Sequence, residues 1–327
     1  MKHSNDLFLR KIGNPWVHLL LDLQNEFSYA TYSFYRSLKI PTIYLPITTG
    51  AISSPMGLGS DSSPVEIELF GVKTYLSDSM QFFLEYGCRF IPHGCFYIMP
   101  SFRGENSDKR HLCQFYHSEA EIPGDFENIR QLVENYVKYL SQWMLDRCAD
   151  PLLEIVGSVT HIEKMASISH FPTIEYNEAI LVLQNFEGCL SNNQLGISSI
   201  TPCGEAKLIQ LFDGVVWLNN MDERLVPFYQ ATTKNGCAIC GDLLFGIGEV
   251  VGAGQRCEND TELISSLERH NVSTEGYDWY IKMKKYYPMK TSGFGMGTER
   301  FLMWIMKHDD IRDCQLISRT NGCHEYI

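Results

Sequence analysis

The spacing of apolar and polar residues predicts a chain of alternating helical and extended segments. Residues 22–39 carry apolar side chains at helical spacing, which predicts an amphipathic helix that ends before Pro41. Residues 65–70 alternate between apolar and polar positions, as a half-buried strand does. By the same criteria we expect strands at 42–45, 72–76, 94–99, 215–218, 240–248 and 250–254, and helices at 77–86, 126–148, 275–286 and 298–307.

The longest predicted helix covers residues 126–148. Asp125 precedes it and can cap its first turn, because a carboxylate accepts hydrogen bonds from the free N–H groups there. Residues 150–210 are less regular and predict two or three helices. The order of helix, strands, helices and strands again favours an α+β domain around a mostly antiparallel sheet over a βαβ array. No linker stands out, so we expect residues 1–327 to form one domain.

Composition and charge narrow the class of protein. The chain has 327 residues and eleven cysteines, and its formal net charge is −12. It contains no run of about 18 uncharged apolar residues, so no membrane span is predicted. Because the N-terminus lacks the apolar run of a signal peptide, we expect a cytoplasmic protein with reduced cysteines. The acidic charge disfavours non-specific nucleic-acid binding, which depends on many phosphate contacts, but it leaves room for a local basic patch.

A glycine-rich segment near the C-terminus carries the first candidate chemistry. Residues 293–301 read GFGMGTERF, with glycines at alternate positions. In a strand these glycines leave one face bare, and a flat ligand can lie against it. The helix expected from Thr298 carries Arg300 in its first turn, where a guanidinium can meet a phosphate. A glycine run alone also fits an ordinary packing turn with a solvated arginine.

A second segment adds complementary groups. Residues 102–115 read FRGENSDKRHLCQF and predict two antiparallel strands joined by a polar loop. Arg103 and Arg110 can reach phosphates from this hairpin. Glu105 can accept a hydrogen bond from an adenine amino group, and Phe115 can stack on a purine. Taken alone, the segment also fits an exposed hairpin with a mixed-charge tip.

Two acidic residues could hold a metal ion. Asp242 and Glu249 are seven positions apart in the sequence DLLFGIGE. If they lie on adjacent strands or across a tight turn, their carboxylates can share a Mg²⁺ ion that bridges nucleotide phosphates. Two solvent-exposed carboxylates beside a turn would fit the same spacing.

Together these segments resemble the signature motifs of a known family. Residues 102–115 look like motif 2, and residues 293–301 look like motif 3, of the class II aminoacyl-tRNA synthetases. The segment 39–46, KIPTIYLP, with the helix before it, is similar to motif 1, whose dimer-interface proline matches Pro46. Two further segments resemble sequences of the aspartate/asparagine branch. They are RHL at residues 110–112, after the motif 2 loop, and Phe-Tyr at residues 228–229. The resemblance implies a homodimeric catalytic core, with helices flanking an antiparallel sheet, that activates a carboxylate with ATP.

The resemblance also assigns individual roles. No general base is implied, because the attacking carboxylate is itself the nucleophile and the enzyme has to position groups and neutralise charge. The implied ATP contacts are Arg103 to the α-phosphate, Arg110 and His111 to the outer phosphates, Arg300 to the γ-phosphate and adenine face, and Glu105 and Phe115 to adenine. The implied Mg²⁺ ligands are Asp242 and Glu249. The implied amino-acid contacts are Ser79, Gln81, Glu119 at the α-ammonium group, and Arg256.

A narrower resemblance concerns the acceptor and the substrate. Residues 52–61 are similar to the archaeal-type asparagine synthetase, an amide-forming paralogue that lacks the anticodon-binding domain. Because motif 1 begins near residue 22, we expect that domain to be absent here too. Relatives that take aspartate usually have a lysine where this chain has Leu84, followed by Glu85, as in asparaginyl synthetases. Gln114 also differs from these relatives, which usually have a glutamate two residues after RHL. These departures point to a substrate other than aspartate.

Three functions remain open at this stage. The first is a tRNA-independent ligase that forms an amide from the activated amino acid and ammonia or an amine. The second is transfer of the amino acid to tRNA or another acceptor, which the acidic charge disfavours. The third is a regulatory paralogue that binds an amino acid or adenylate without turnover. The presence of Arg103, Arg300, Asp242 and Glu249 argues against the third.

Overall fold

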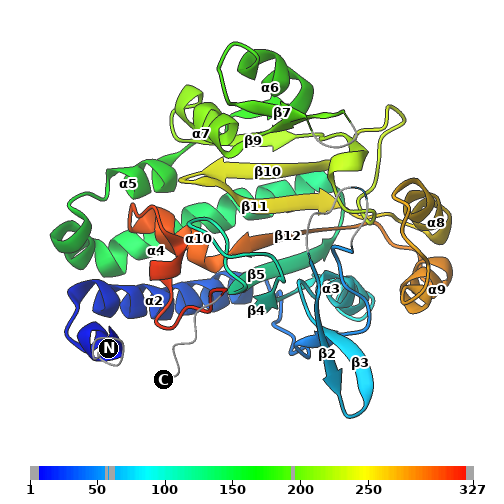
Figure 1. The fold of residues 1–327 in the computed structure, drawn as a ribbon, viewed down its shortest axis with the longest axis horizontal. Helices are drawn as coiled ribbons and strands as arrows, with labels where there is room; N and C mark the ends of the chain where they lie inside the picture. Colours follow the sequence, from blue (N-terminus) through cyan, green and yellow to red (C-terminus); the bar gives the residue numbers. More distant parts are fainter. Residues whose placement is uncertain (1–6, 56–57, 59–62, 193–195, 322–327) are drawn as a thin grey trace.

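A seven-stranded sheet forms the centre of the molecule in the computed structural model, which describes residues 7–55, 58, 63–192 and 196–321. Neighbouring strands are antiparallel, except for one parallel pair at an edge. The α+β fold with a mainly antiparallel sheet is therefore confirmed (Figure 1). The strand order is β4 (Cys95–Phe102), β5 (Gln114–Pro123), β12 (Thr291–Gly297), β11 (Gly248–Gln255), β10 (Cys240–Phe245), β9 (Val215–Asn219) and β6 (Thr173–Glu175).

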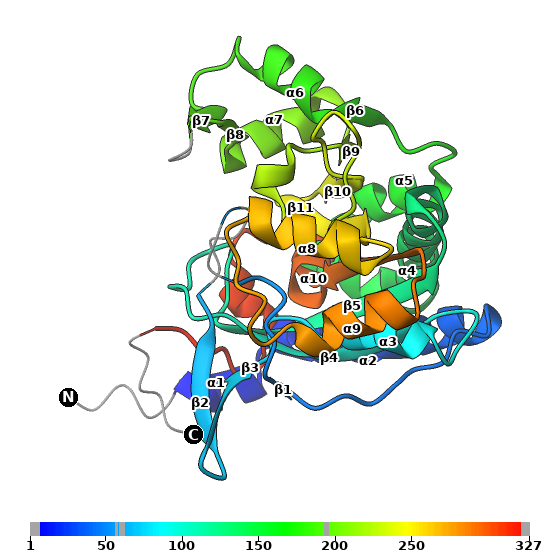
Figure 2. The same ribbon diagram turned by 90° about the vertical axis from the view of Figure 1, so that its right-hand side faces the viewer.

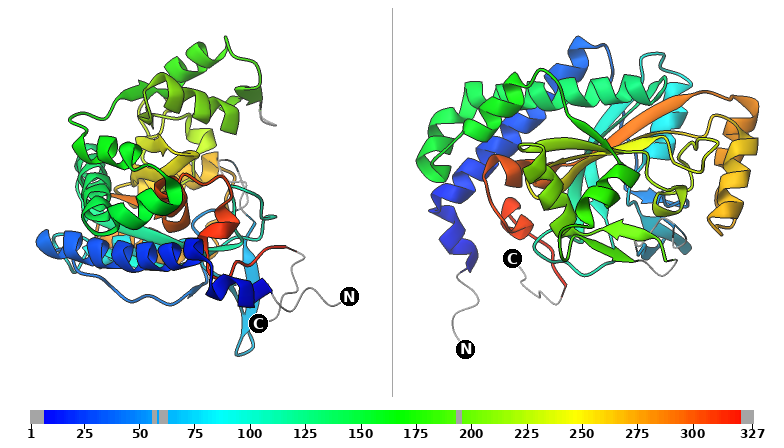
Figure 3. Two further views of the ribbon diagram at one scale, coloured as in Figure 1. Left: turned by 90° about the vertical axis from the view of Figure 1, so that its left-hand side faces the viewer. Right: turned by 90° about the horizontal axis from the view of Figure 1, so that it is seen from above.

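Two long helices cover one face of this sheet. α2 (Pro15–Ser37) and α4 (Phe126–Val156) pack against each other, and Figure 3 shows them together on one side of the strands. Their apolar stripes and the inward residues of the strands form the main core, which includes Phe27, Tyr136 and Trp217. The other helices are α1 (Leu7–Ile12), α3 (Gln81–Cys88), α5 (Thr160–Ser167), α6 (Tyr176–Leu183), α7 (Pro202–Leu211), α8 (Asp260–Arg269), α9 (Asp278–Tyr286) and α10 (Thr298–Ile305).

Smaller elements surround this core. The hairpin of β2 (Val65–Leu69) and β3 (Val72–Leu76) projects away from the main sheet (Figure 2), and Phe70 at its tip is 97% exposed. None of the described helices has both the length and the apolar character needed to cross a membrane. The remaining elements are β1 (Thr48–Thr49), which joins β3, the pair β7 (Leu190–Asn192) and β8 (Ser198–Ile200), and the 3₁₀ turns η1 (Glu223–Leu225) and η2 (Ile311–Cys314).

Capping residues explain where the two long helices begin. α2 starts seven residues before the predicted position, because the Asn14 side chain accepts a hydrogen bond from the N–H of Trp16 and Pro15 occupies the first turn. The predicted cap at Asp125 is confirmed, and it forms a reciprocal capping box with Asn128. α4 continues to Val156, beyond the predicted end, and stops at Gly157, whose φ of 82° is left-handed.

Several predicted boundaries were wrong. Residues 42–45 form no strand: Thr42 makes a single bridge to Phe96, and the prolines on either side restrict further pairing. The predicted strand 240–248 breaks into a hairpin, because the chain turns at Gly246, where φ is 63°. α3 begins at Gln81 rather than at residue 77. α8 was not predicted, although Asn259 caps it.

A buried ion pair joins α9 to α3. The Lys284 ammonium group on α9 donates to the Glu85 carboxylate on α3, and both side chains are fully buried. Lys284 also donates to the Cys257 carbonyl at 2.6 Å, and the Tyr280 hydroxyl donates to Glu85 at 2.5 Å. Both charges are buried and, among the described residues, are satisfied by each other, by these neutral partners and by the Thr291 hydroxyl, so removal of one charge leaves the other uncompensated.

We therefore expect Lys284→Met to lower the free energy of unfolding by about 3–5 kcal/mol, since Glu85 is left as an unpaired buried carboxylate. The double variant Lys284→Met/Glu85→Leu should recover most of this loss. Lys285→Met changes the exposed neighbouring lysine and should have little effect. Urea unfolding followed by circular dichroism measures all three; equal losses for Lys284→Met and Lys285→Met would contradict the expectation.

Candidate active site

The floor of the site is a patch of sheet without side chains. Gly293, Gly295 and Gly297 occupy alternate positions of β12 and share one face, as the sequence predicted. On the neighbouring strand, Gly254 pairs with Gly293 and Gly252 pairs with Gly295, so their faces coincide. Glu121 and Gln230 cover Gly293 and Gly254, so the surface that stays bare consists of Gly252, Gly295 and Gly297, and there a ligand can approach the backbone of two strands closely.

Three ionisable residues of β5 border this floor. His117, Glu119 and Glu121 pair with the β12 glycines, so their side chains point to the same face. Glu119 is buried; its carboxylate accepts hydrogen bonds from the hydroxyls of Ser79, at 2.6 Å, and Tyr97, and lies 2.9 Å from Nδ1 of His117. Burial raises the pKa of Glu119, but His117 and these hydrogen bonds outweigh it, so the net pKa is lowered. An ionised carboxylate suits the predicted contact with an ammonium group.

Two adjoining cavities lie over the floor. The first is lined by residues of both predicted nucleotide-binding segments, and the second by the predicted amino-acid residues. The cavities share Arg103, His117, Glu249 and Gly295. Predicted site residues are distributed as follows: Arg110, His111, Phe115 and Arg300 line the first cavity, and Ser79, Gln81, Glu119, Asp242 and Arg256 line the second.

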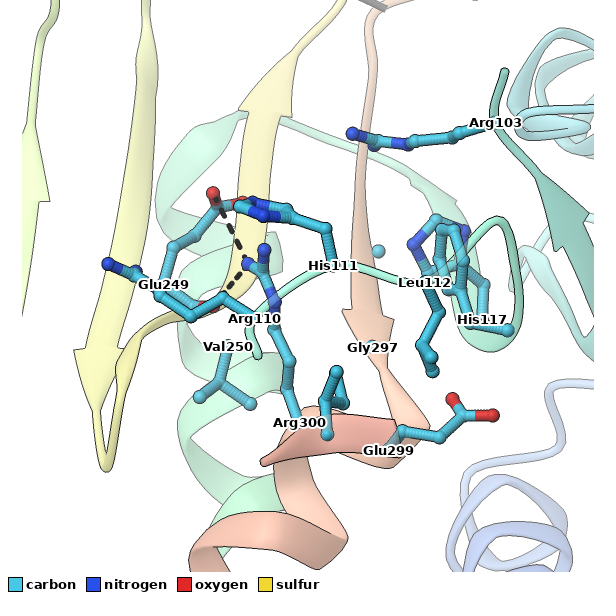
Figure 4. Close-up of a pocket in the computed structure, with 13 residues that line it drawn as sticks. Arg103, Arg110, His111, Leu112, His117, Glu249, Val250, Gly297, Glu299 and Arg300 are labelled. Carbon is cyan, nitrogen blue, oxygen red and sulfur yellow. Dashed lines mark hydrogen bonds and ion pairs between the residues drawn. The ribbon is translucent and has the colours of Figure 1, made fainter. Parts of the chain in front are cut away.

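The first cavity collects positive charge. Arg103 and Arg300 turn toward the same space as Glu249 in Figure 4. Nη1 of Arg300 donates to the Glu249 carbonyl at 2.6 Å and lies 3.7 Å from its carboxylate. Burial and the nearby guanidinium groups of Arg103 and Arg110 lower the pKa of Arg300. Cations held this close together form a site suited to a polyanion.

A β-bulge brings the two predicted metal ligands together. In the hairpin of β10 and β11, Asp242 pairs with Gly252, and the register shifts between Leu243 and Leu244. The shift turns Glu249 to the same face as Asp242, although regular alternation from Gly252 would turn it away. Both carboxylates lie beside the bare Cα of Gly252. The predicted proximity of the two acids is confirmed.

The donor set at this hairpin fits Mg²⁺. Carboxylate oxygens are ligands that Mg²⁺ prefers. Burial, and then the neighbouring carboxylates of Glu249 and Glu205, raise the pKa of Asp242 well above its ordinary value. A divalent cation between the acids would remove this repulsion, because it supplies opposite charge where like charges meet.

Arg256, at the far end of the second cavity, is already paired. Its Nε and Nη2 donate to the buried Glu121 carboxylate at 3.1–3.2 Å, and its Nη1 donates to Gln230 at 3.3 Å. The guanidinium also lies 5.3 Å from the ring centre of Tyr229. The pair has no net charge, so this end of the cavity offers directional N–H donors more than an excess positive charge.

Some predicted contacts are placed elsewhere or lie outside the described residues. Glu105 lines neither cavity, although one of its oxygens is buried without a hydrogen-bond partner among the described residues. His111 borders the first cavity but also binds Asp108 at 2.9 Å. The segment 52–61, which resembles asparagine synthetase, is described only at residues 52–55 and 58.

Several residues of the site were not predicted from the sequence. His117 and Glu121 lie two positions on either side of Glu119, so strand alternation alone could have identified them. Glu205, which binds Arg110, and Gln230, which binds Arg256, come from distant segments that carried no comparable signal. Their roles depend on the tertiary fold.

Comparisons with known proteins agree with the observed fold. A family model of class II tRNA synthetases (D, K and N) matches residues 7–321. The asparaginyl-tRNA synthetase from Pyrococcus horikoshii, solved with asparaginyl-adenylate, superposes with a TM-score of 0.86 at 25% identity, covering 95% of this chain and 70% of that one. The Entamoeba histolytica asparaginyl enzyme, also with asparaginyl-adenylate, gives 0.81 at 22% identity over 94% and 68%. The aspartyl-tRNA synthetase of the same organism gives 0.79 at 18% over 99% and 63%.

Filling the bare floor should block the site. Gly295→Val places a branched side chain between the cavities, so we expect the affinity for a fluorescent ATP analogue to fall at least about tenfold, with the fold retained. Gly13→Val is a matched control, because Gly13 has open space around its Cα far from the sheet. Fluorescence titration and thermal melting check both; unchanged affinity in Gly295→Val would show that the floor is not the binding surface.

Proposed function

The chain belongs to the family of class II tRNA synthetases of the D, K and N type, with the core of an ATP-dependent ligase, and from this premise we propose that it converts an amino acid and ATP into an aminoacyl-adenylate and pyrophosphate. The position of Arg103 carries the proposal. Its side chain lines both cavities, at the junction where a carboxylate in one would meet an α-phosphate in the other. No carboxylate among the described residues pairs with it, so its charge is available for a phosphate.

The proposed reaction is an in-line displacement at phosphorus. A carboxylate oxygen of the amino acid attacks the α-phosphorus of ATP, the bond to the β-phosphate oxygen breaks, and pyrophosphate leaves. Arg103 neutralises charge on the α-phosphate, and Arg300 neutralises charge on the departing phosphates. Glu119 orients the amino acid through its ammonium group. A Mg²⁺ ion held by Asp242 and Glu249 would supply further charge neutralisation at the outer phosphates.

The charges of the second cavity suggest which amino acid enters. A side-chain carboxylate needs an unpaired cation of its own, but Arg103 is assigned to the α-phosphate, and Arg256, the other arginine that lines this cavity, is paired with Glu121. Position 84, where aspartate-specific relatives have a lysine, is a buried leucine in an apolar cluster. We therefore propose an amino acid with an uncharged polar side chain, held by the N–H groups of Arg256.

We consider two nucleophiles that could accept the aminoacyl group of the adenylate. The net charge of −12 favours a small neutral or cationic nucleophile, so ammonia or an amine is our first choice, with an amide as the product. The similar solved structures are tRNA synthetases, which favours transfer to tRNA as the alternative. Ammonia or amine consumption without RNA, measured against acceptor labelling with RNA, separates the two.

We also propose a homodimer formed through the segment that resembles motif 1. Exposed aromatic residues gather on this segment: Tyr29 and Tyr32 on α2 are 61% and 42% exposed, and Tyr44 beyond the helix is 92% exposed. Large aromatic side chains on a surface are typical of the centre of an interface.

Amino-acid-dependent exchange between pyrophosphate and ATP tests the activity. We expect exchange with uncharged polar amino acids and less with aspartate. Arg103→Ala and Arg300→Ala should each lower kcat about 10²–10³-fold, because each removes a charged donor from the developing charge. Arg147→Ala, on the exposed side of α4, should leave the rate unchanged. Absence of exchange across a full panel of amino acids would reject adenylation.

Analytical ultracentrifugation tests the dimer. The unmodified protein should sediment as a dimer, and Tyr44→Asp should shift it toward the monomer, since a charge would be buried at the interface. Phe70→Asp alters an equally exposed aromatic residue on the β2–β3 hairpin and serves as the control. A monomeric unmodified protein would contradict the proposal.

A further inference from the structure

One arginine of the nucleotide cavity is bound by a residue outside the motifs. Nη2 of Arg110, on the loop between β4 and β5, donates to Oε2 of Glu205 at 2.5 Å. Glu205 lies in the first turn of α7, 95 positions later in the chain. The two side chains are only 22% and 21% exposed, so the pair is shielded from bulk water. Such a pair is stronger than a fully exposed one.

The absence of a side chain at Gly248 leaves the space that this pair occupies. A Cβ on Gly248 would overlap both Oε2 of Glu205 and Nη2 of Arg110. Gly248 has a φ of 139°, which a residue with a side chain rarely adopts, and it directly precedes Glu249. The pair therefore rests against the start of β11, next to one of the two predicted Mg²⁺ ligands.

Arg110 keeps donors for a ligand while it is bound in this way. Glu205 engages only Nη2, and the buried Nε of Arg110 has no hydrogen-bond partner among the described residues. Arg110 also lines the first cavity, where it is close enough to Arg300 for the two cations to repel each other. Glu205 lines neither cavity, and its carboxylate offsets this repulsion and fixes the direction in which the remaining N–H groups of Arg110 point.

We propose that Glu205 is a positioning residue, which holds the guanidinium of Arg110 toward the β- and γ-phosphates of ATP. Glu205 acts through Arg110 and does not contact the nucleotide. The assignment rests on the proposed function, since it presumes that the first cavity takes ATP.

Calorimetric titrations with ATP and with AMP, both in Mg²⁺, test the assignment. We expect Glu205→Gln to weaken ATP binding about tenfold, as for loss of one oriented charge-assisted contact. AMP binding should not change, because AMP lacks the phosphates that Arg110 would meet. Glu187→Gln alters an exposed glutamate between α6 and β7, before α7, and should leave both affinities unchanged. Melting temperatures of the variants check that the fold is retained.

A double variant shows whether Glu205 works through Arg110. Arg110→Ala/Glu205→Gln should bind ATP no more weakly than Arg110→Ala alone, since the partner being positioned is gone. Unchanged or tighter ATP binding in Glu205→Gln would overturn the assignment, as would equal losses for ATP and AMP or additive losses in the double variant. If the unmodified protein bound no ATP, the proposed function would fail and the assignment with it.

Discussion

Close approach to bare backbone is the constraint on which the site depends. The Glu121 carboxylate lies directly over Gly293, the Gln230 amide over Gly254, and the Glu205–Arg110 pair over Gly248; a Cβ at any of these glycines would overlap the polar group above it. The glycines therefore do more than leave room for a ligand. They allow the groups around the cleft to reach their partners from β5, from two loops and from α7.

Charge compensation follows from this packing. Three arginines of the cleft have carboxylate neighbours: Arg110 has Glu205, Arg256 has Glu121, and Arg300 has Glu249. Burial makes an uncompensated guanidinium costly, so these pairs allow cations to be concentrated without a bound anion. Arg103 differs, since it packs over the Phe115 ring and meets no carboxylate among the described residues. Of these four arginines, Arg103, at the junction of the two cavities, is thus the one without a carboxylate neighbour among the described residues.

Local signals in the sequence were enough to identify the fold and the motif residues. The spacing of glycines in β12, the cap at Asp125 and the apolar periodicity of α4 each act over a few residues, so they can be read without knowledge of the tertiary structure. The partners of Arg110 and Arg256 could not be predicted, because Glu205 and Gln230 meet them only through the fold. Residues 42–45 have strand-forming side chains but lack the pairing that a strand needs.

The shifted register between β10 and β11 sets a limit on how this protein can vary. Asp242 and Glu249 share a face only because one strand has an extra residue at this point. Straightening this strand with all its residues kept would send the second carboxylate into the apolar layer beneath α4, whereas loss of the extra residue would leave Glu249 opposite Leu244, on the face of Asp242. The bulge and the number of residues in β11 therefore have to match each other, and this protein should tolerate exchange of Ile247 in the turn more readily than a change that removes the bulge but keeps the residue count.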